Sequence, residues 1–252
     1  MSIDSAKTIL VIGATSGIGR ALALPLAALP SKPTVIAAGR RQERLDELAS
    51  QGLEAVQLDV AASREVLQKN VADILAKYPN LDAIILASGI QYQHNFKSGI
   101  NLDEIHQEFT VNYFSIVTLV SLFIPHFLAL SEKGLPSWIS PITSGLALMP
   151  APQVINYSAS KAALHSFSES LRVQLADTKI NVLEIIPPLV ESELHDAQGT
   201  TEALSKFWMP LDEYTSKTLD GLRKGDKHIA VGTAGKVWDK VQSSGLDGPY
   251  KV

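Results

Sequence analysis

The stretch Gly13-Ala14-Thr15-Ser16-Gly17-Ile18-Gly19 decides the fold, because it joins a strand-like run to a helix. Residues 8–12 form a β-branched, apolar run typical of a buried strand. Residues 18–28 favour a helix, which Pro30 and Pro33 end. Glycines let the backbone turn sharply and approach a pyrophosphate, and the helix N-terminus offers free N–H groups to an anion. This context predicts a phosphate-binding loop, although a glycine turn needed only for packing is the alternative.

Strand-like and helix-like segments alternate along the rest of the chain. Further strands are predicted at 34–38, 54–58, 81–86, 137–143, 180–186 and 228–231, and helices at 42–50, 63–77, 101–130, 156–176, 212–224 and 233–243. Short connections between them indicate a Rossmann-type, doubly wound parallel α/β sheet of about seven strands with helices on both faces. We expect a single domain over residues 1–252 that ends in a polar, Gly-rich tail. Pro125 should kink its helix or lie near its end.

Composition excludes several classes of function. The 252 residues are 46% hydrophobic and 19% charged, which is typical of a globular protein. A formal net charge of −4 gives no indication of nucleic-acid binding. The absence of cysteine excludes disulfides, thiolate zinc sites and a cysteine nucleophile. We expect no apolar run long enough to span a bilayer. The polar N-terminus lacks the features of a signal peptide, so we expect no membrane association and a cytoplasmic location.

The end of the second predicted strand indicates which cofactor the loop would bind. An acidic residue there would accept hydrogen bonds from the ribose and favour NAD(H). Here the strand ends with Ala38-Gly39-Arg40-Arg41. Arg40 can pair with a 2′-phosphate, and Gly39 leaves room for it, so NADP(H) is predicted rather than NAD(H). Alternatively, Arg40, Arg41 and Arg44 form a solvated surface patch.

Asp59 ends the third predicted strand. Its carboxylate can accept a hydrogen bond from the adenine amino group, or it can cap the helix that begins near Ser63.

An acid–base unit follows in the second half of the chain. Tyr157 and Lys161 are four residues apart, which places them on one face of a helix. A phenol has a pKa near 10, and a neighbouring ammonium should lower that pKa. The pair can then give a proton to a carbonyl or take one from an alcohol. Ser144, which follows a predicted strand, can hold the substrate oxygen beside the phenol.

Together these motifs resemble the short-chain dehydrogenase/reductase family in its single-domain form with Tyr-x-x-x-Lys. The resemblance runs from residue 8 to about 231, and the family motif T-G-x-x-x-G-x-G matches residues 12–19 with Ile12 in place of threonine. It implies that Ser144, Tyr157 and Lys161 are catalytic. It also implies that Asn112 holds a water that links Lys161 to solvent.

Two segments depart from the family pattern. Leu86-Ala87-Ser88-Gly89 replaces N-N-A-G, and Pro187-Pro188-Leu189-Val190-Glu191-Ser192 replaces P-G-x-V-x-T. Val190 and Ser192 can still contact the nicotinamide carboxamide. The predicted cofactor-binding residues are Gly13, Ser16, Gly17, Ile18, Gly19, Arg40, Arg41, Asp59, Val60, Ala87, Gly89, Tyr157, Lys161, Pro187, Leu189, Val190 and Ser192. No metal site is predicted.

Three loops, 94–100, 146–155 and 187–210, should determine substrate specificity. Their apolar side chains suggest a lipophilic or bulky substrate, and they are Leu146, Leu148, Met149, Phe207 and Trp208. Phe207, Trp208 and Met209 either cover the substrate or pack on the core. His94 and His195 are candidates for contact with substrate, whereas Glu191, Glu193 and Asp196 favour a solvated loop.

The sequence therefore predicts an NADP(H)-dependent oxidoreductase that moves a hydride between nicotinamide and a carbonyl/alcohol substrate, with Tyr157 as acid/base. The alternatives are a non-redox lyase or epimerase, or a cofactor-binding regulator, on the same scaffold. The expected partner is a small molecule. The resemblance also implies a homodimer or homotetramer assembled through helices 101–130 and 156–176.

Overall fold

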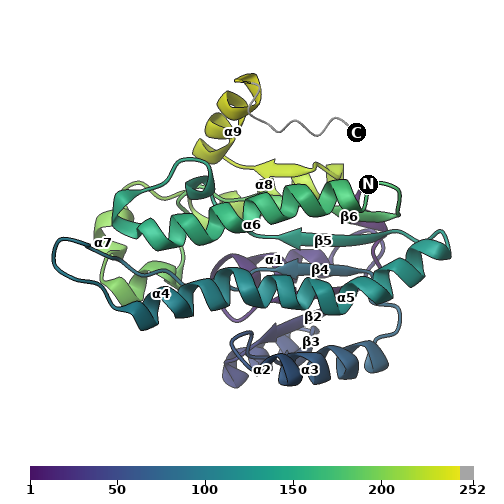
Figure 1. Cartoon of the computed structure of the whole chain (residues 1–252). Helices are drawn as coiled ribbons and strands as arrows, with labels where there is room; N and C mark the ends of the chain where they lie inside the picture. Colours follow the sequence, from purple (N-terminus) through teal and green to yellow (C-terminus); the bar gives the residue numbers. More distant parts are fainter. Residues whose placement is uncertain (245–252) are drawn as a thin grey trace.

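Six strands pair in parallel at the centre of the structure, in the order β3-β2-β1-β4-β5-β6 (Figure 1). This computed structural model describes residues 1–244, so the predicted tail beyond that point lies outside the described residues. The strands of this sheet are β1 Thr8–Ile12, β2 Thr34–Gly39, β3 Glu54–Gln57, β4 Ala83–Leu86, β5 Ser137–Pro141 and β6 Ile180–Val182. The predicted doubly wound α/β fold is confirmed.

Helices cover both faces of this sheet because its central strands are apolar on both sides. Along β1, Ile9 and Val11 pack with the helices of one face, while Leu10 and Ile12 pack with those of the other. The first face carries α1 Gly17–Ala27, α2 Gln42–Ser50 and α8 Leu211–Lys224. The second carries α3 Arg64–Lys77, α5 Ser115–Glu132 and α6 Ile155–Gln174. In Figure 1, α6 and the helix formed by α4 and α5 lie side by side on the near face of the sheet.

The strand order reverses between β1 and β4, which lie side by side although α1 to α3 separate them in sequence. In doubly wound sheets, ligands bind beyond the carboxyl ends of the strands at such a reversal. This position is where the glycine-rich loop follows β1.

The prediction of a single strand over residues 180–186 is wrong, because the structure has two strands there. β6 pairs with β5, whereas β7 (Glu184–Ile186) pairs with β8 (His228–Ala230) in a separate two-stranded sheet. The N–H groups of Ser137 and Thr143 donate to the carbonyls of Lys179 and Ile185, at 3.1 and 2.9 Å. The same spacing would pair residue 141 with Leu183, but Pro141 has no N–H to donate. One backbone hydrogen bond is therefore missing from this pairing, and β5 ends at Pro141 rather than at residue 143.

The long helix predicted at 101–130 has three parts, α4 (Leu102–Phe109), a π-helical turn (Thr110–Phe114) and α5. Pro125 lies inside α5 and does not end it. The expectation that no segment could span a bilayer is wrong by length and composition, because Leu102–Glu132 is long and apolar enough. In the most apolar 18-residue stretch of this helix, 33% is buried, and Phe123 and Phe127 pack into the core. Such a helix alone is weak evidence for a membrane, because core helices share this composition.

The remaining elements complete the edge where the loops gather. A 3-10 segment (Glu193–Gln198) and α7 (Thr201–Leu204) follow β7, and α9 (Thr233–Ser243) follows β8.

Candidate functional site

A cavity of about 1020 Å³ opens at the carboxyl edge of the sheet, beside the reversal between β1 and β4. It is lined by the glycine loop, the segments after β2 to β5, the start of α6 and the loop after β7. Ser144, Tyr157 and Lys161 line it, as do all the predicted cofactor-binding residues except Gly19. The fold therefore brings two motifs that lie far apart in the sequence to one space.

In the glycine loop, which lines this cavity, there is no room for side chains at two of the glycines. Gly13 has a φ of +92°, and a Cβ there would lie 2.6 Å from the backbone nitrogen of Ser88. A Cβ on Gly19 would lie 2.3 Å from the carbonyl oxygen of Gly13. Gly19 therefore packs α1 against the loop and does not line the cavity, and its contact with cofactor stays a prediction. Since α1 begins at Gly17 without a side-chain cap, its first N–H groups suit an anion.

Arginines gather at one end of the cavity. The guanidinium of Arg41 donates to Thr15 Oγ1 (3.2 Å), Ser16 Oγ (2.5 Å) and Glu193 (3.0 Å). Arg44 also donates to Glu193, at 2.5 Å. Arg40 lines the cavity, and its side chain has no hydrogen-bond partner within residues 1–244. Arg41 and Arg44 thus form an ion-pair cluster with the loop after β7 rather than a simple solvated patch.

Asp59 and Val60 also line this end. The Asp59 carboxylate accepts from the backbone N–H of Ala61 at 3.0 Å. It is not the cap of α3, because Ser63 occupies the N-cap position and accepts from the N–H of Val66. Of the two roles considered for Asp59, the helix cap is excluded, and the adenine contact stays a prediction.

The predicted acid–base residues lie together at the other end of the cavity. Tyr157 and Lys161 are on the same face of α6, with the ammonium 5.7 Å from the centre of the phenol ring. Lys161 Nζ donates to the carbonyl of Ile142 at 2.8 Å. Ser144 lies beyond the end of β5, and its hydroxyl accepts from the N–H of Leu146 at 3.1 Å. The three side chains are buried.

Burial determines the acidity of this group. It raises the pKa of Tyr157 well above its usual value, a shift that Ser144 opposes and the carboxylate of Glu108 increases. The expectation that Lys161 lowers this pKa is therefore wrong for the protein alone. Burial also lowers the pKa of Lys161 to about 8, which Glu108 partly offsets. At neutral pH the phenol is protonated and can act as a proton donor.

Asn112 lies in the π-helical turn and is fully buried. Its Nδ2 donates to the carbonyl of Ile90 (2.9 Å) and to Ser160 Oγ (3.1 Å), and its Oδ1 accepts from the N–H of Ile90 (2.9 Å). These bonds tie the loop after β4 to α6. Among residues 1–244 Oδ1 accepts this one hydrogen bond, which leaves its second acceptor position, and the water relay implied by the resemblance stays a prediction.

Glu108 is a buried carboxylate beside this group that the sequence reasoning missed. It accepts from the N–H of Tyr92 (2.8 Å) and from Asn156 Nδ2 (2.6 Å). Burial raises its pKa despite these bonds. A signal was present in the sequence, because Glu108 lies one helical turn before Asn112 in a predicted helix.

Both segments that depart from the family pattern still line the cavity, through Ala87, Gly89, Pro187, Leu189, Val190 and Ser192. A Cβ on Gly89 would lie 3.6 Å from both Asn112 Oδ1 and Lys161 Nζ. The backbone N–H of Gly145 donates to the carbonyl of Pro187 at 2.8 Å. The loss of the family asparagines and glycine therefore leaves the backbone at this edge hydrogen-bonded.

Of the loops predicted to determine substrate specificity, some residues line the cavity and others pack elsewhere. Leu146, Met149, Leu194, His195 and Leu204 line the cavity. The apolar cluster that follows α7 does not cover it. Met209 packs against the core, and Phe207 is 79% exposed.

The two candidate histidines differ in position. His195 is buried in the wall of the cavity, whereas His94 lines a smaller neighbouring hollow. Leu148 also lies away from the cavity and packs with Ile186 and Trp238.

With this geometry established, similarity to known proteins identifies the family. Residues 7–203 match the family model described as short chain dehydrogenase, so the chain belongs to that family of oxidoreductases. It is 37% identical over 232 residues to the uncharacterized oxidoreductase DltE of Bacillus subtilis, covering 88% of this chain and 87% of that protein.

Solved structures agree on the fold. A short-chain dehydrogenase/reductase from Burkholderia phymatum in complex with NAD superposes with a TM-score of 0.82 at 19% identity, covering 100% of this chain and 99% of the other. The closed form of a serine dehydrogenase complexed with NADP⁺ has a TM-score of 0.74 at 25% identity, covering 83% and 86%. Structures similar to this one thus bind NAD or NADP⁺.

Proposed function

We propose that this chain is a single-domain, NADP(H)-dependent oxidoreductase acting on a carbonyl/alcohol pair. The observation that carries the proposal is that Ser144, Tyr157 and Lys161 share one cavity with the glycine loop. The bare backbone at Gly13 and the uncapped start of α1 fit a pyrophosphate, and the cavity extends from there to the buried phenol.

The side chains of this cavity have distinct proposed roles. When bound, the nicotinamide cofactor would supply or accept the hydride. Ser144 would hold the substrate oxygen beside Tyr157, whose raised pKa keeps the proton on the phenol until a carbonyl oxygen receives it. Lys161 would bind the ribose hydroxyls and hold positive charge near the phenol. Asn112 would support the exchange of protons with solvent.

Preference for NADP(H) rests on the arginine end of the cavity. Arg40 lies there without a side-chain hydrogen bond to the described part of the chain, so its guanidinium can bind a 2′-phosphate. Arg41 lies beside it, although Glu193 already neutralises part of its charge. No acidic residue follows β2 directly to accept the ribose hydroxyls of NAD(H).

The first experiment is a fluorescence titration of the purified protein with NADPH and NADH, followed by a panel of aldehydes and ketones. The proposal expects tighter binding of NADPH and NADPH consumption with at least one carbonyl compound. Tight binding without turnover on the whole panel would favour a cofactor-binding regulator. Product formation without net NADPH consumption would indicate a lyase or epimerase.

A bulky or lipophilic substrate fits the substrate end of the cavity. Leu146, Met149, Leu194 and Leu204 give this end apolar walls, and His195 adds a polar edge that could contact substrate. Activity that rises with the chain length of a series of aliphatic aldehydes would support this proposal, and equal activity along the series would contradict it.

We also propose that two or four chains assemble in the cytoplasm through α4, α5 and α6. Apolar side chains stay exposed on these helices and on the π-helical turn between α4 and α5, such as Ile155 (46%) and Phe114 (57%). Light scattering that gives the mass of a dimer or tetramer would support this assembly, and the mass of one chain would refute it. Cell fractionation tests the location.

A further inference from the structure

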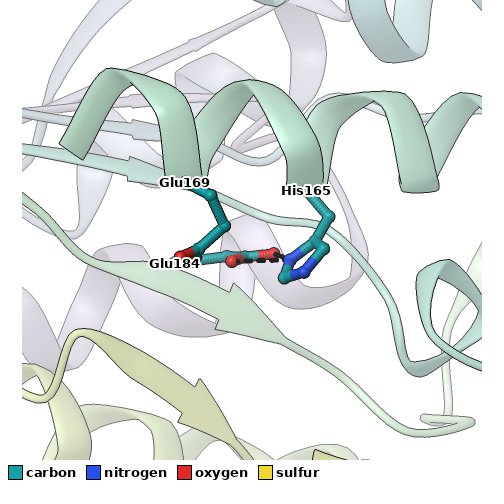
Figure 2. A group of neighbouring side chains, drawn as sticks. All are labelled: His165, Glu169 and Glu184. Carbon is teal, nitrogen blue, oxygen red and sulfur yellow. Dashed lines mark hydrogen bonds and ion pairs between the residues drawn. The ribbon is translucent and has the colours of Figure 1, made fainter. Parts of the chain in front are cut away.

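A second cluster of titratable side chains lies along α6, beyond the catalytic pair. His165 follows Lys161 by one helical turn and Glu169 follows by two, and both meet Glu184 from β7 (Figure 2). Glu184 is fully buried, and its two oxygens lie 2.8 and 3.0 Å from His165 Nδ1. The cluster is outside the cavity and has no role in the proposed function.

The cluster has the residue types of a metal site, but its charges are already balanced by protein groups. Arg172 donates to Glu169, which also lies 2.5 Å from His228 Nε2. Glu184 accepts from Thr143 Oγ1 at 2.6 Å in addition to His165. A guanidinium in contact with a prospective ligand repels a cation, so the donor set favours internal ion pairing.

Through Thr143 the cluster reaches the catalytic residues. Thr143 is the residue between Ile142, whose carbonyl accepts from Lys161, and Ser144. Its hydroxyl is held by Glu184, and its backbone N–H donates to the carbonyl of Ile185 at 2.9 Å. These bonds therefore hold the segment that follows β5, beyond Pro141, where one backbone hydrogen bond to the neighbouring strand is missing.

We propose that the buried pair of His165 and Glu184 positions the segment from Ile142 to Ser144, and with it the catalytic serine and the acceptor for Lys161. This inference rests on the proposed function. His165, Glu184 and Thr143 are positioning residues, because they act through this segment and do not touch the reacting atoms.

The charges around the cluster give the pair a dependence on pH. His165 faces Glu184 on β7, Glu169 and Arg172 on its own helix, and His228 on β8, with Trp238 of α9 against its ring. With both imidazoles neutral, two carboxylates face one guanidinium, so one bound proton makes the cluster neutral. Burial alone lowers the pKa of His165, but the hydrogen bond and charge of Glu184 outweigh it, and the pKa lies above its usual value. His165 therefore carries its positive charge below that pKa and loses it as the pH rises through that value.

The decisive experiment compares Thr143→Val with Thr143→Ser in the full chain. Valine removes the hydroxyl that Glu184 holds, and a small displacement of Ser144 should lower kcat by about tenfold or more while the KM for NADPH changes less than about twofold. Serine keeps the hydroxyl and should restore kcat. Equal kcat in wild type and Thr143→Val would overturn the proposal, as would equal losses in both variants.

A second measurement separates positioning from general stability. Glu184→Gln should lower kcat, and it should also lower the pKa of His165, which NMR of the imidazole measures. The side chain of Glu169 does not touch Thr143, so Glu169→Gln should leave kcat within about twofold of wild type. Loss of kcat in both variants in proportion to their melting temperatures would indicate only a structural role.

Failure of the proposed function can be recognised separately. If the wild type turns over no substrate, amide hydrogen exchange of Gly145 still reports the position of this segment. Faster exchange in Thr143→Val but not in Thr143→Ser supports the positioning role without any catalysis, and unchanged exchange in both contradicts it.

Discussion

The two ends of the cavity are built in opposite ways. One is the end where the reaction is proposed to occur, called the reaction end. There, Tyr157 and Lys161 are 7% and 3% exposed, and the nearby Glu108 is fully buried. At the arginine end, the side chains of Arg41 and Glu193 are 45% and 44% exposed and pair across the cavity edge. The first end holds its charges in a medium of low polarity, and the second holds them in water.

This difference determines how each end responds to change. A buried charge loses its hydration, so its pKa moves and each neighbouring charge acts strongly on it. An exposed ion pair contributes only about 0–1 kcal/mol and weakens as salt screens it. Substitutions at the reaction end should therefore have large effects that depend on pH, and those at the arginine end small effects that depend on salt.

The largest effect is expected from Tyr157→Phe. This change removes the proton donor and keeps the ring, so kcat should fall by at least about 100-fold, the usual contribution of a general acid. The affinity for NADPH, followed by fluorescence, should change little. If the variant kept more than a few per cent of wild-type turnover, Tyr157 would not be the acid/base.

Glu108→Gln should shift a pH profile. Burial lowers the pKa of Lys161 to about 8, and Glu108 offsets part of that shift. Affinity for NADPH should fall as the pH rises through this value, because the ammonium loses its charge. Without the Glu108 carboxylate this pKa is lower, so the fall should begin at a lower pH.

Titrations with NADPH across the pH range measure this effect. Asp103→Asn, on the exposed first turn of the same helix, is the matched control and should keep the wild-type profile. Identical profiles for Glu108→Gln and wild type would show that Glu108 does not act on Lys161.

Arg40→Ala tests the arginine end. Loss of one exposed, charge-assisted hydrogen bond should weaken NADPH binding by about tenfold and leave NADH binding unchanged. Arg64→Ala, an exposed arginine at the start of α3 outside the cavity, controls for net charge. Equal weakening of both cofactors by Arg40→Ala would contradict a 2′-phosphate site.

The smallest effect is expected from Glu193→Gln. This carboxylate competes with any phosphate for Arg41 and Arg44. Its removal should tighten NADPH binding by about twofold to fivefold at low salt, with the gain vanishing at high salt. Glu202→Gln, on the adjoining α7, should have no such effect. A gain that persists at high salt would mean that the arginine end does not behave as an exposed site.

Much of the fold was predictable because its signals are local. The run at β1, the glycine loop and α1 follow one another in the sequence, and their residue types specify each element. The spacing of Tyr157 and Lys161 likewise placed both on one helical face. The cause of the break between β6 and β7 was also visible in the sequence, because Pro141 has no N–H to donate. That this missing hydrogen bond falls opposite Leu183 could be identified only once the register of β5 and β6 was known.

The sequence by itself therefore determined the doubly wound sheet, the glycine loop after β1 and the Tyr157–Lys161 pair, since each depends on residues close together in the chain. Only the tertiary structure decided that Glu193 meets Arg41, that the charge of Glu108 acts on Lys161 and that Glu184 holds Thr143. These contacts join residues from separate elements, and the burial that shifts the pKa of Tyr157 exists only when those elements pack together.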